Sequence, residues 1–154
     1  MRKIFLLLIF SLDSYSDISN DLNDFFNNEL SFIQTSKNKL NNISEESKGI
    51  YKKNTNESVI IEVNYPFRET YLINQNEIKI HDHEFDQVKR VSINKINNNL
   101  IIDYLINGFP EDFKNKINES EIEFSLDFVN KNTLRIKFKD NMEIDNVIEF
   151  IKDD

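Results

Sequence analysis

Cysteine and tryptophan are absent from the 154-residue chain, which also contains only two glycines and two prolines. Without cysteine there can be no disulfide bond, thiol catalysis or thiolate metal site. Because glycine and proline are scarce, the turns must be made largely by Asn, Asp, Lys and Ser. The sequence also has no Gly-x-Ser-x-Gly motif, phosphate-binding loop or nucleophile with an obvious base. We therefore expect neither an enzyme nor a protein with a cofactor.

Basic residues are also fewer than acidic ones: the chain contains 19 Lys and Arg and 27 Asp and Glu, which gives a net charge of −8. An acidic chain without a basic stripe repels phosphate backbones, so nucleic acid is not expected as a partner. Hydrophobic residues make up 39% of the sequence and include 13 Phe and 5 Tyr. This is enough apolar material for one packed core in a chain of this length. We expect a single domain that is a monomer.

The longest apolar run, Ile4–Phe10, is far shorter than the roughly 20 residues that span a bilayer. Arg2 and Lys3 precede this run and a polar stretch follows it, which is the order of a secretory signal peptide. A first β-strand with a basic flank is the alternative. We predict a signal peptide over residues 1–16 and an exported, diffusible mature domain over residues 17–154.

The hydrophobic pattern changes along the chain between a helical period and a period of two. Leu22, Phe25 and Phe26 share one face of a helix. In residues 58–65 the odd-numbered positions from Val59 to Tyr65 are apolar or aromatic and share one face of a strand. The predicted helices cover residues 17–28, 97–106 and 111–117, the predicted strands cover residues 31–35, 49–53, 58–65, 68–73, 77–80, 85–93, 122–128, 134–138 and 144–151, and residues 38–47 form a polar loop.

These elements predict an α+β fold, mainly β with helices, because the helices interrupt an antiparallel meander rather than alternate with its strands. We expect an unclosed antiparallel β-barrel or curved sheet with a helical lid on the concave face. Such a half-open barrel leaves an apolar groove for a ligand, whereas an ordinary packed core is the alternative. The candidate groove residues are Leu22, Phe25, Phe26, Val59, Ile61, Val63, Tyr65, Leu100, Tyr104, Leu105, Ile122, Phe124, Leu126 and Phe128.

Several segments together match the pattern of a known family. Phe32–Thr35 reads Phe-Ile-Gln-Thr on an early strand, Gly49 opens the next strand, and Pro66 ends an alternating strand. The segments Ile78–Asp82 and Phe85–Val88 follow at matching spacing. In this combination the chain resembles the outer-membrane lipoprotein carrier proteins, the LolA family, more strongly before residue 95 than after it.

The resemblance implies a periplasmic protein with an unclosed barrel and a helical lid. Proteins of this family accept an acylated lipoprotein from an inner-membrane ABC lipoprotein-releasing transporter. They carry its lipid chains in a hydrophobic cavity and pass it to an outer-membrane acceptor lipoprotein. A periplasmic lipid-binding or sensor module of the same fold, without transport activity, is the alternative.

The chain departs from the family pattern in three ways. Thr55 stands where the family has an Arg that holds the lid closed, so this latch is missing or is delegated to Lys53. His81 and Lys79 replace a Tyr and an aromatic residue. The family also continues with another hairpin beyond Asp154, so a more open barrel is expected here.

The stretch IKIHDHEFDQV, residues 78–88, allows two interpretations. His81 and His83 are two positions apart, so on a strand both would point the same way, as a pair of metal ligands requires. Alternatively, the stretch is the tip of a β-hairpin. We favour the hairpin and expect no metal, because two imidazoles without a third convincing ligand make a weak site.

Overall fold

The computed structural model describes residues 18–38, 40–54, 57–96, 100–120, 123–140 and 142–153. The predicted signal peptide, residues 1–16, lies outside the described residues, as do the groove candidate Ile122 and the latch position Thr55. Within these ranges, no helix is both long and apolar enough to cross a membrane.

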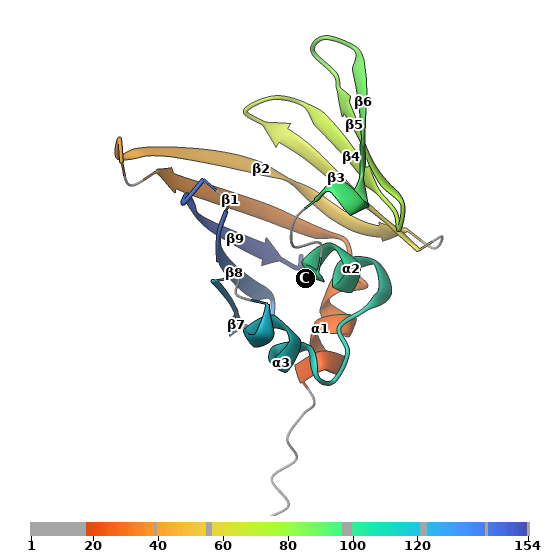
Figure 1. Ribbon diagram of the computed structural model, residues 1–154, viewed down its shortest axis with the longest axis vertical. Helices are drawn as coiled ribbons and strands as arrows, with labels where there is room; N and C mark the ends of the chain where they lie inside the picture. Colours follow the sequence, from red (N-terminus) through yellow and green to blue (C-terminus); the bar gives the residue numbers. More distant parts are fainter. Residues whose placement is uncertain are drawn as a thin grey trace, which may run out of the picture.

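Nine antiparallel strands form one curved sheet that does not close into a barrel (Figure 1). Their order is β6-β5-β4-β3-β2-β1-β9-β8-β7, so β6 and β7 are the edges. The predicted α+β class with an unclosed, curved antiparallel sheet is thereby confirmed. The strands are β1 (Leu30–Asn38), β2 (Ile43–Asn54), β3 (Ser58–Tyr65), β4 (Glu69–Ile73), β5 (Glu77–Asp82), β6 (Gln87–Ser92), β7 (Phe124–Asn130), β8 (Thr133–Lys139) and β9 (Asp145–Ile151).

The helices gather on one side of the sheet, beside the start of β1 and the end of β6 (Figure 1). Gly108, with a φ of 98°, ends α2 in the left-handed region that favours glycine. The next residue, Phe109, donates its N–H to Asn23 Oδ1 at 2.8 Å and accepts a hydrogen bond from Asn23 Nδ2 at 3.0 Å. This pair of bonds ties α1 to the α2–α3 connection. The helices are α1 (Ile18–Phe26), the 3-10 turn η1 (Ile93–Lys95), α2 (Leu100–Asn107) and α3 (Phe113–Glu119).

Residues 38–47 were expected to form a polar loop, and this prediction is wrong. β1 continues to Asn38 and β2 begins at Ile43, and these two residues pair across a tight hairpin. The alternation of apolar and polar residues is lost here because this end of β2 is exposed on both faces. Strand pairing through the backbone does not need an apolar side chain, so the hydrophobic pattern could not show this part of the strand.

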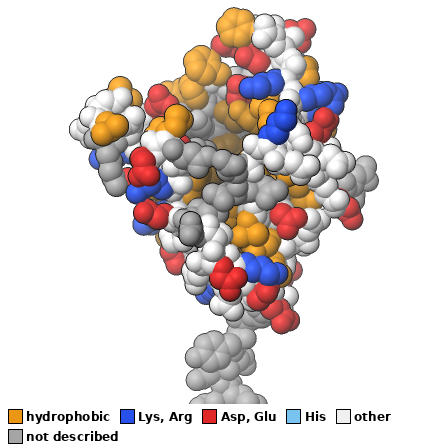
Figure 2. Space-filling view, viewed as in Figure 1, with side chains coloured by type: hydrophobic (Ala, Val, Ile, Leu, Met, Phe, Trp, Pro, Cys, Tyr) orange, Lys and Arg blue, Asp and Glu red, His pale blue; other side chains and the backbone are white. Residues whose placement is uncertain are grey.

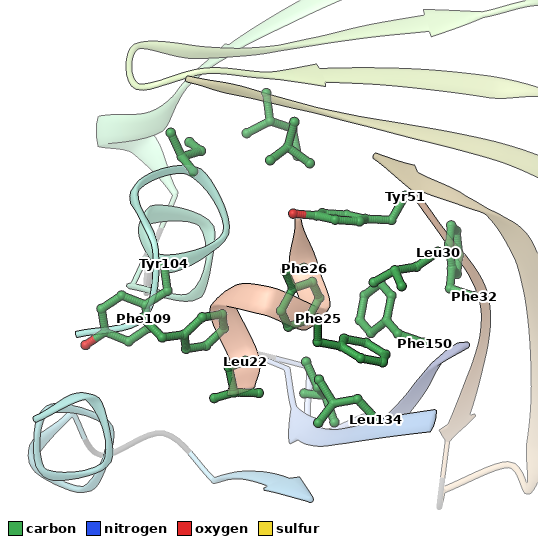
Figure 3. Close-up of a cluster of buried hydrophobic side chains, with 14 of the residues drawn as sticks. Leu22, Phe25, Phe26, Leu30, Phe32, Tyr51, Tyr104, Phe109, Leu134 and Phe150 are labelled. Carbon is green, nitrogen blue, oxygen red and sulfur yellow. The ribbon is translucent and has the colours of Figure 1, made fainter. Parts of the chain in front are cut away.

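The core lies between the helices and one face of the sheet, which we call the inner face and which carries Tyr51 and Phe150. The ring of Phe26 on α1 lies 5.4 Å from the ring of Tyr51 and 5.2 Å from that of Phe150. It also stacks on Phe109 at 5.5 Å, so it joins the sheet to the α2–α3 connection. Figure 3 shows Phe26 at the centre of these rings, pointing toward the sheet. Edge-to-face and stacked rings of this kind give a close-packed interior.

Candidate binding groove

An apolar groove of about 500 Å³ lies on the part of the inner face that α1 does not cover. Cross-strand pairing brings its walls together from strands that are distant in sequence as well as from consecutive ones. Phe32 on β1 is opposite Phe150 on β9, and Val63 on β3 is opposite Glu69 on β4. The residues that line this inner groove are Phe32, Gln34, Glu45, Ser47, Ile61, Val63, Pro66, Phe67, Glu69, Tyr71, Ile148 and Phe150.

The floor of the inner groove is aromatic. The rings of Phe32 and Phe150 have centroids 6.2 Å apart, and both side chains are buried. Phe32 also covers Gly49, where a Cβ would lie 2.7 Å from Cε1 of the ring. The glycine therefore makes room for Phe32 to lie low against the sheet. This leaves the space above it open between β3, β4 and β9.

The charged groups of the inner groove are both carboxylates, Glu45 and Glu69. The Tyr71 hydroxyl donates a 2.5 Å hydrogen bond to Glu69 Oε2. Burial raises the pKa of Tyr71, and the hydrogen bond and negative charge of Glu69 raise it further, so the phenol stays protonated. No Lys, Arg or His belongs to the lining set. The inner groove therefore suits a neutral apolar ligand better than an anionic one.

A buried polar cluster joins β1 to β9 beside the inner groove. Asn146, which is buried, accepts a 2.6 Å hydrogen bond from Ser36 Oγ and a 3.2 Å bond from Gln34 Nε2 through its Oδ1. Its Nδ2 donates to the carbonyl oxygen of Ile144 at 3.0 Å. Because these groups bond to one another, they hold the two strands together at the side of the groove.

Of the described residues that were predicted to line a groove, Ile61 and Val63 alone line this one. Phe25 contributes instead to a shallow depression beside β7 and β8, together with Phe128. Apart from Tyr65, the described candidates outside the inner groove belong to the core or pack against it. Leu22, Phe25, Phe26, Val59 and Tyr104 are buried in the core, and Leu100, Leu105, Phe124, Leu126 and Phe128 are partly buried and packed against it.

Tyr65 lies on the other face of the sheet from Val63, which corrects the prediction that both share a face. The pairing of β2 with β3 shifts register between Lys48, which is opposite Tyr65, and Gly49, which is opposite Val63. An extra residue in one strand of an antiparallel pair reverses the alternation beyond it. Tyr65 is 54% exposed and lies under the Lys48 ammonium, whose nitrogen is 6.0 Å from the ring centroid.

Sequence reasoning missed most of the inner groove, including Phe32, Tyr71, Ile148 and Phe150. These residues lie at alternating positions of strands whose bounds were predicted approximately. The alternation within each strand could therefore have placed them on one face. What was missing is the pairing of β1 with β9, which are more than 100 residues apart in sequence. Alternation alone does not tell which strands are neighbours.

The two histidines lie on the β5–β6 hairpin, as predicted. His81 is in β5 and its Nε2 lies 3.0 Å from Asp86 Oδ1, while His83 is in the turn and its Nε2 lies 2.8 Å from Thr70 Oγ1. Their ring centroids are 4.2 Å apart. Among the described residues, no group of three or more His, Asp or Glu side chains is placed to hold a metal ion. Each imidazole is accounted for by a local hydrogen bond.

No protein-family profile matches the chain, and no curated protein matches it in sequence.

Proposed function

We propose that this protein is a periplasmic carrier that binds the acyl chains of lipoproteins in the inner groove and shuttles them from the inner to the outer membrane. The observation that carries the proposal is the 500 Å³ apolar groove on the inner face of an unclosed nine-stranded sheet. An inner-membrane ABC lipoprotein-releasing transporter would supply the cargo, and an outer-membrane acceptor lipoprotein would receive it. The family resemblance of the sequence supports these two partners.

The chemistry of the inner groove is suited to reversible binding of acyl chains. Each methylene group that leaves water contributes about 0.8 kcal/mol, so burial of part of a chain is enough for useful affinity. The wall offers rings and branched side chains such as Phe32, Val63 and Ile148, and its Gln34 amide is already bonded to Asn146. Few directional polar contacts are therefore available to hold the ligand, which favours its release to an acceptor.

We further propose that α2 and α3 act as the lid, while α1 stays in place. Leu22, Phe25 and Phe26 of α1 are at most 5% exposed, so lifting α1 would open the core itself. On α2, Tyr104 and Ile106 are equally buried, but the four other apolar residues of the helix, Leu100, Ile101, Ile102 and Leu105, are only partly buried. Hydrogen exchange with and without a bound acyl ester tests this division: protection should change in α2 and α3 and remain constant in α1.

A binding assay with a soluble, neutral acyl ester tests the core of the proposal. The ester should bind one to one, and a free fatty acid of the same length should bind more weakly at neutral pH because its carboxylate would face Glu45 and Glu69. That difference should narrow as the pH falls and the carboxyl group of the fatty acid itself becomes protonated. Absence of ester binding to the folded protein would contradict the proposal.

A release assay separates a carrier from a lipid-binding or sensor module. The mature protein is incubated with spheroplasts that bear the cognate ABC transporter, and the supernatant is examined for lipoproteins. Soluble one-to-one complexes are expected of a carrier. Ester binding without any release of lipoproteins would instead identify a lipid-binding module.

A further inference from the structure

Four hairpin turns lie along the end of the sheet opposite the helices, and we call this end the tip end. They connect β1 to β2, β3 to β4, β5 to β6 and β8 to β9. The antiparallel order of the strands places all four at the same end. Figure 1 shows the β5–β6 turn at the top and the β1–β2 turn at the far left, both projecting away from α1, α2 and α3.

Large apolar side chains are exposed at each of these turns. Leu40 is 95% exposed, Phe67 59%, Phe85 70% and Met142 73%. Ile43, Tyr65 and Val88, which are also exposed, lie within two residues of the same turns, so among the described residues Val129 is the one exposed large apolar side chain elsewhere. In Figure 2 hydrophobic side chains accordingly protrude at the top and upper left of the molecule.

Turn geometry does not require these apolar residues. At the tip end, the backbone N–H of Leu40 donates to Asn38 Oδ1 at 2.9 Å, and that of Met142 donates to Asp140 Oδ1 at 2.8 Å. At the opposite end of the sheet the same kind of bond joins Asn76 to Asn74 and Asn132 to Asn130, and the equivalent residue is polar. Because the same turn accepts asparagine in these places, the apolar residues at the tip end call for another explanation.

We propose that the tip end docks on the surface of a net-neutral lipid bilayer, with the side chains of Leu40, Phe67, Phe85 and Met142 inserted among the lipids. A bilayer fits better than a protein partner because the apolar residues stand on separate turns between charged neighbours such as Glu84, Asp86 and Glu143. A protein interface would bury those carboxylates, whereas the headgroup region keeps them hydrated.

The charge of the tip end specifies the kind of bilayer. The described residues of its turns include Arg68 but also Glu84, Asp86, Asp140 and Glu143, so acidic groups prevail. Attraction to anionic lipids depends on Lys and Arg near the surface, and the described residues of these turns carry no excess of them. Binding should therefore depend on apolar insertion and should be insensitive to salt.

The inner groove opens toward the tip end, since Pro66 and Phe67 belong both to its lining and to the β3–β4 turn. An acyl chain that leaves a bilayer beside Phe67 would pass directly to the apolar wall of Val63 and Ile148. The inference rests on the proposed function at this point, because a bilayer is the source and destination of the chains that the groove would hold.

Co-sedimentation with phosphatidylcholine vesicles tests the inference on the whole mature chain. The wild-type protein should bind, and the variant with Leu40→Ser, Phe67→Ser, Phe85→Ser and Met142→Ser should lose binding, while each single change should weaken it roughly tenfold. Val129→Ser, at the exposed large apolar site outside the tip end, is the control and should bind like wild type. Urea unfolding of each variant verifies that these surface changes leave the fold intact.

Three results would overturn the inference: no vesicle binding by the wild type, unchanged binding by the fourfold variant, or binding that requires anionic phosphatidylglycerol and disappears in salt. A soluble acyl ester, assayed without vesicles, keeps this test apart from the proposed function. Ester binding without vesicle binding would leave the proposed function standing and remove membrane docking. Vesicle binding without ester binding would support membrane docking and contradict the proposed function.

Discussion

The ring of Phe32 on β1 occupies the space that a side chain at Gly49 on β2 would fill. A Cβ at residue 49 would lie 2.7 Å from Cε1 of Phe32 and 2.0 Å from the carbonyl oxygen of Glu62. Both distances are well below van der Waals contact. The floor of the inner groove thus depends on the absence of a side chain at one position of one strand.

Gly49→Ala should therefore destabilise the protein, by about 1–3 kcal/mol, because the methyl group forces Phe32 and the Glu62 backbone to move. The sign of the change in stability is informative, because Gly→Ala in an unobstructed strand increases stability by up to about 1 kcal/mol. Urea unfolding measures the change in the free energy of unfolding. Ser47→Ala, two residues earlier on the same strand, is the control and should have a small effect; a stabilised Gly49→Ala protein would contradict the close contact.

Ile148→Asp should reduce acyl-ester affinity at least roughly tenfold, because it places a third carboxylate in the inner groove. Val147→Asp is the matched control: it is the adjacent residue of β9, is also partly buried, and lies on the outer face beside Arg135 and Lys137. Affinity is measured by titration with a fluorescent neutral ester, after urea unfolding has shown that both variants are folded. Equal affinities of the two variants would exclude Ile148 from the binding wall.

Asn146→Ala should destabilise the protein by about 1–3 kcal/mol, because it leaves the Ser36 hydroxyl and the Gln34 amide without their shared acceptor. In a double-mutant cycle with Ser36→Ala, the two changes should couple by at least about 0.5 kcal/mol. The free energies come from urea unfolding of the four proteins. Purely additive effects would show that the 2.6 Å bond between Ser36 and Asn146 does not hold β1 to β9.

Tyr51→Phe should leave the stability at pH 7 unchanged or slightly higher, because the buried Tyr51 hydroxyl has no hydrogen-bond partner among the described residues. Burial raises the pKa of this hydroxyl above its ordinary value of 10.0. The unfolded chain therefore releases the proton first as the pH rises, so the contribution of Tyr51 is complete below pH 10 and is lost above it.

Stability measured from pH 8 to pH 11 checks this prediction. The wild-type free energy of unfolding should fall above pH 10, and Tyr51→Phe should reduce that fall. Tyr71→Phe is the comparison, because its hydroxyl donates a bond to Glu69 and its removal should cost stability at pH 7 as well. A loss of more than about 2 kcal/mol at pH 7 in Tyr51→Phe would show that the hydroxyl has a partner after all.

The fold was predictable from sequence where side chains alternate against a core. β7 alternates between partly buried and exposed residues, β8 buries Leu134 and Ile136 at alternate positions, and Gly108 ends α2 as its position indicates. The prediction failed where the backbone alone decides the structure. The outer part of the β1–β2 hairpin is exposed on both faces, and the bulge beside Lys48 moves Tyr65 to the opposite face without any mark in the pattern.

The sequence indicated that the protein has an apolar groove, but it did not indicate where on the sheet the groove lies. Apolar side chains on one face of an unclosed sheet indicated a groove, but helix residues such as Phe26 fill the part of it that was expected to stay open. The open part lies toward the tip end, where β9 supplies Ile148 and Phe150 to the wall. Its position depends on how far α1 covers the sheet, which is a matter of three-dimensional packing and not of local periodicity.

The most direct measurement is photo-crosslinking of the protein with a neutral acyl ester that carries a diazirine on its chain, followed by mass-spectrometric mapping. Binding in the inner groove predicts labels on β1, β4 and β9, near Phe32, Tyr71 and Ile148. Labels confined to α1 and α2, at Phe26 or Tyr104, would place the ligand in the region that is now packed core and contradict the inner groove as the binding site.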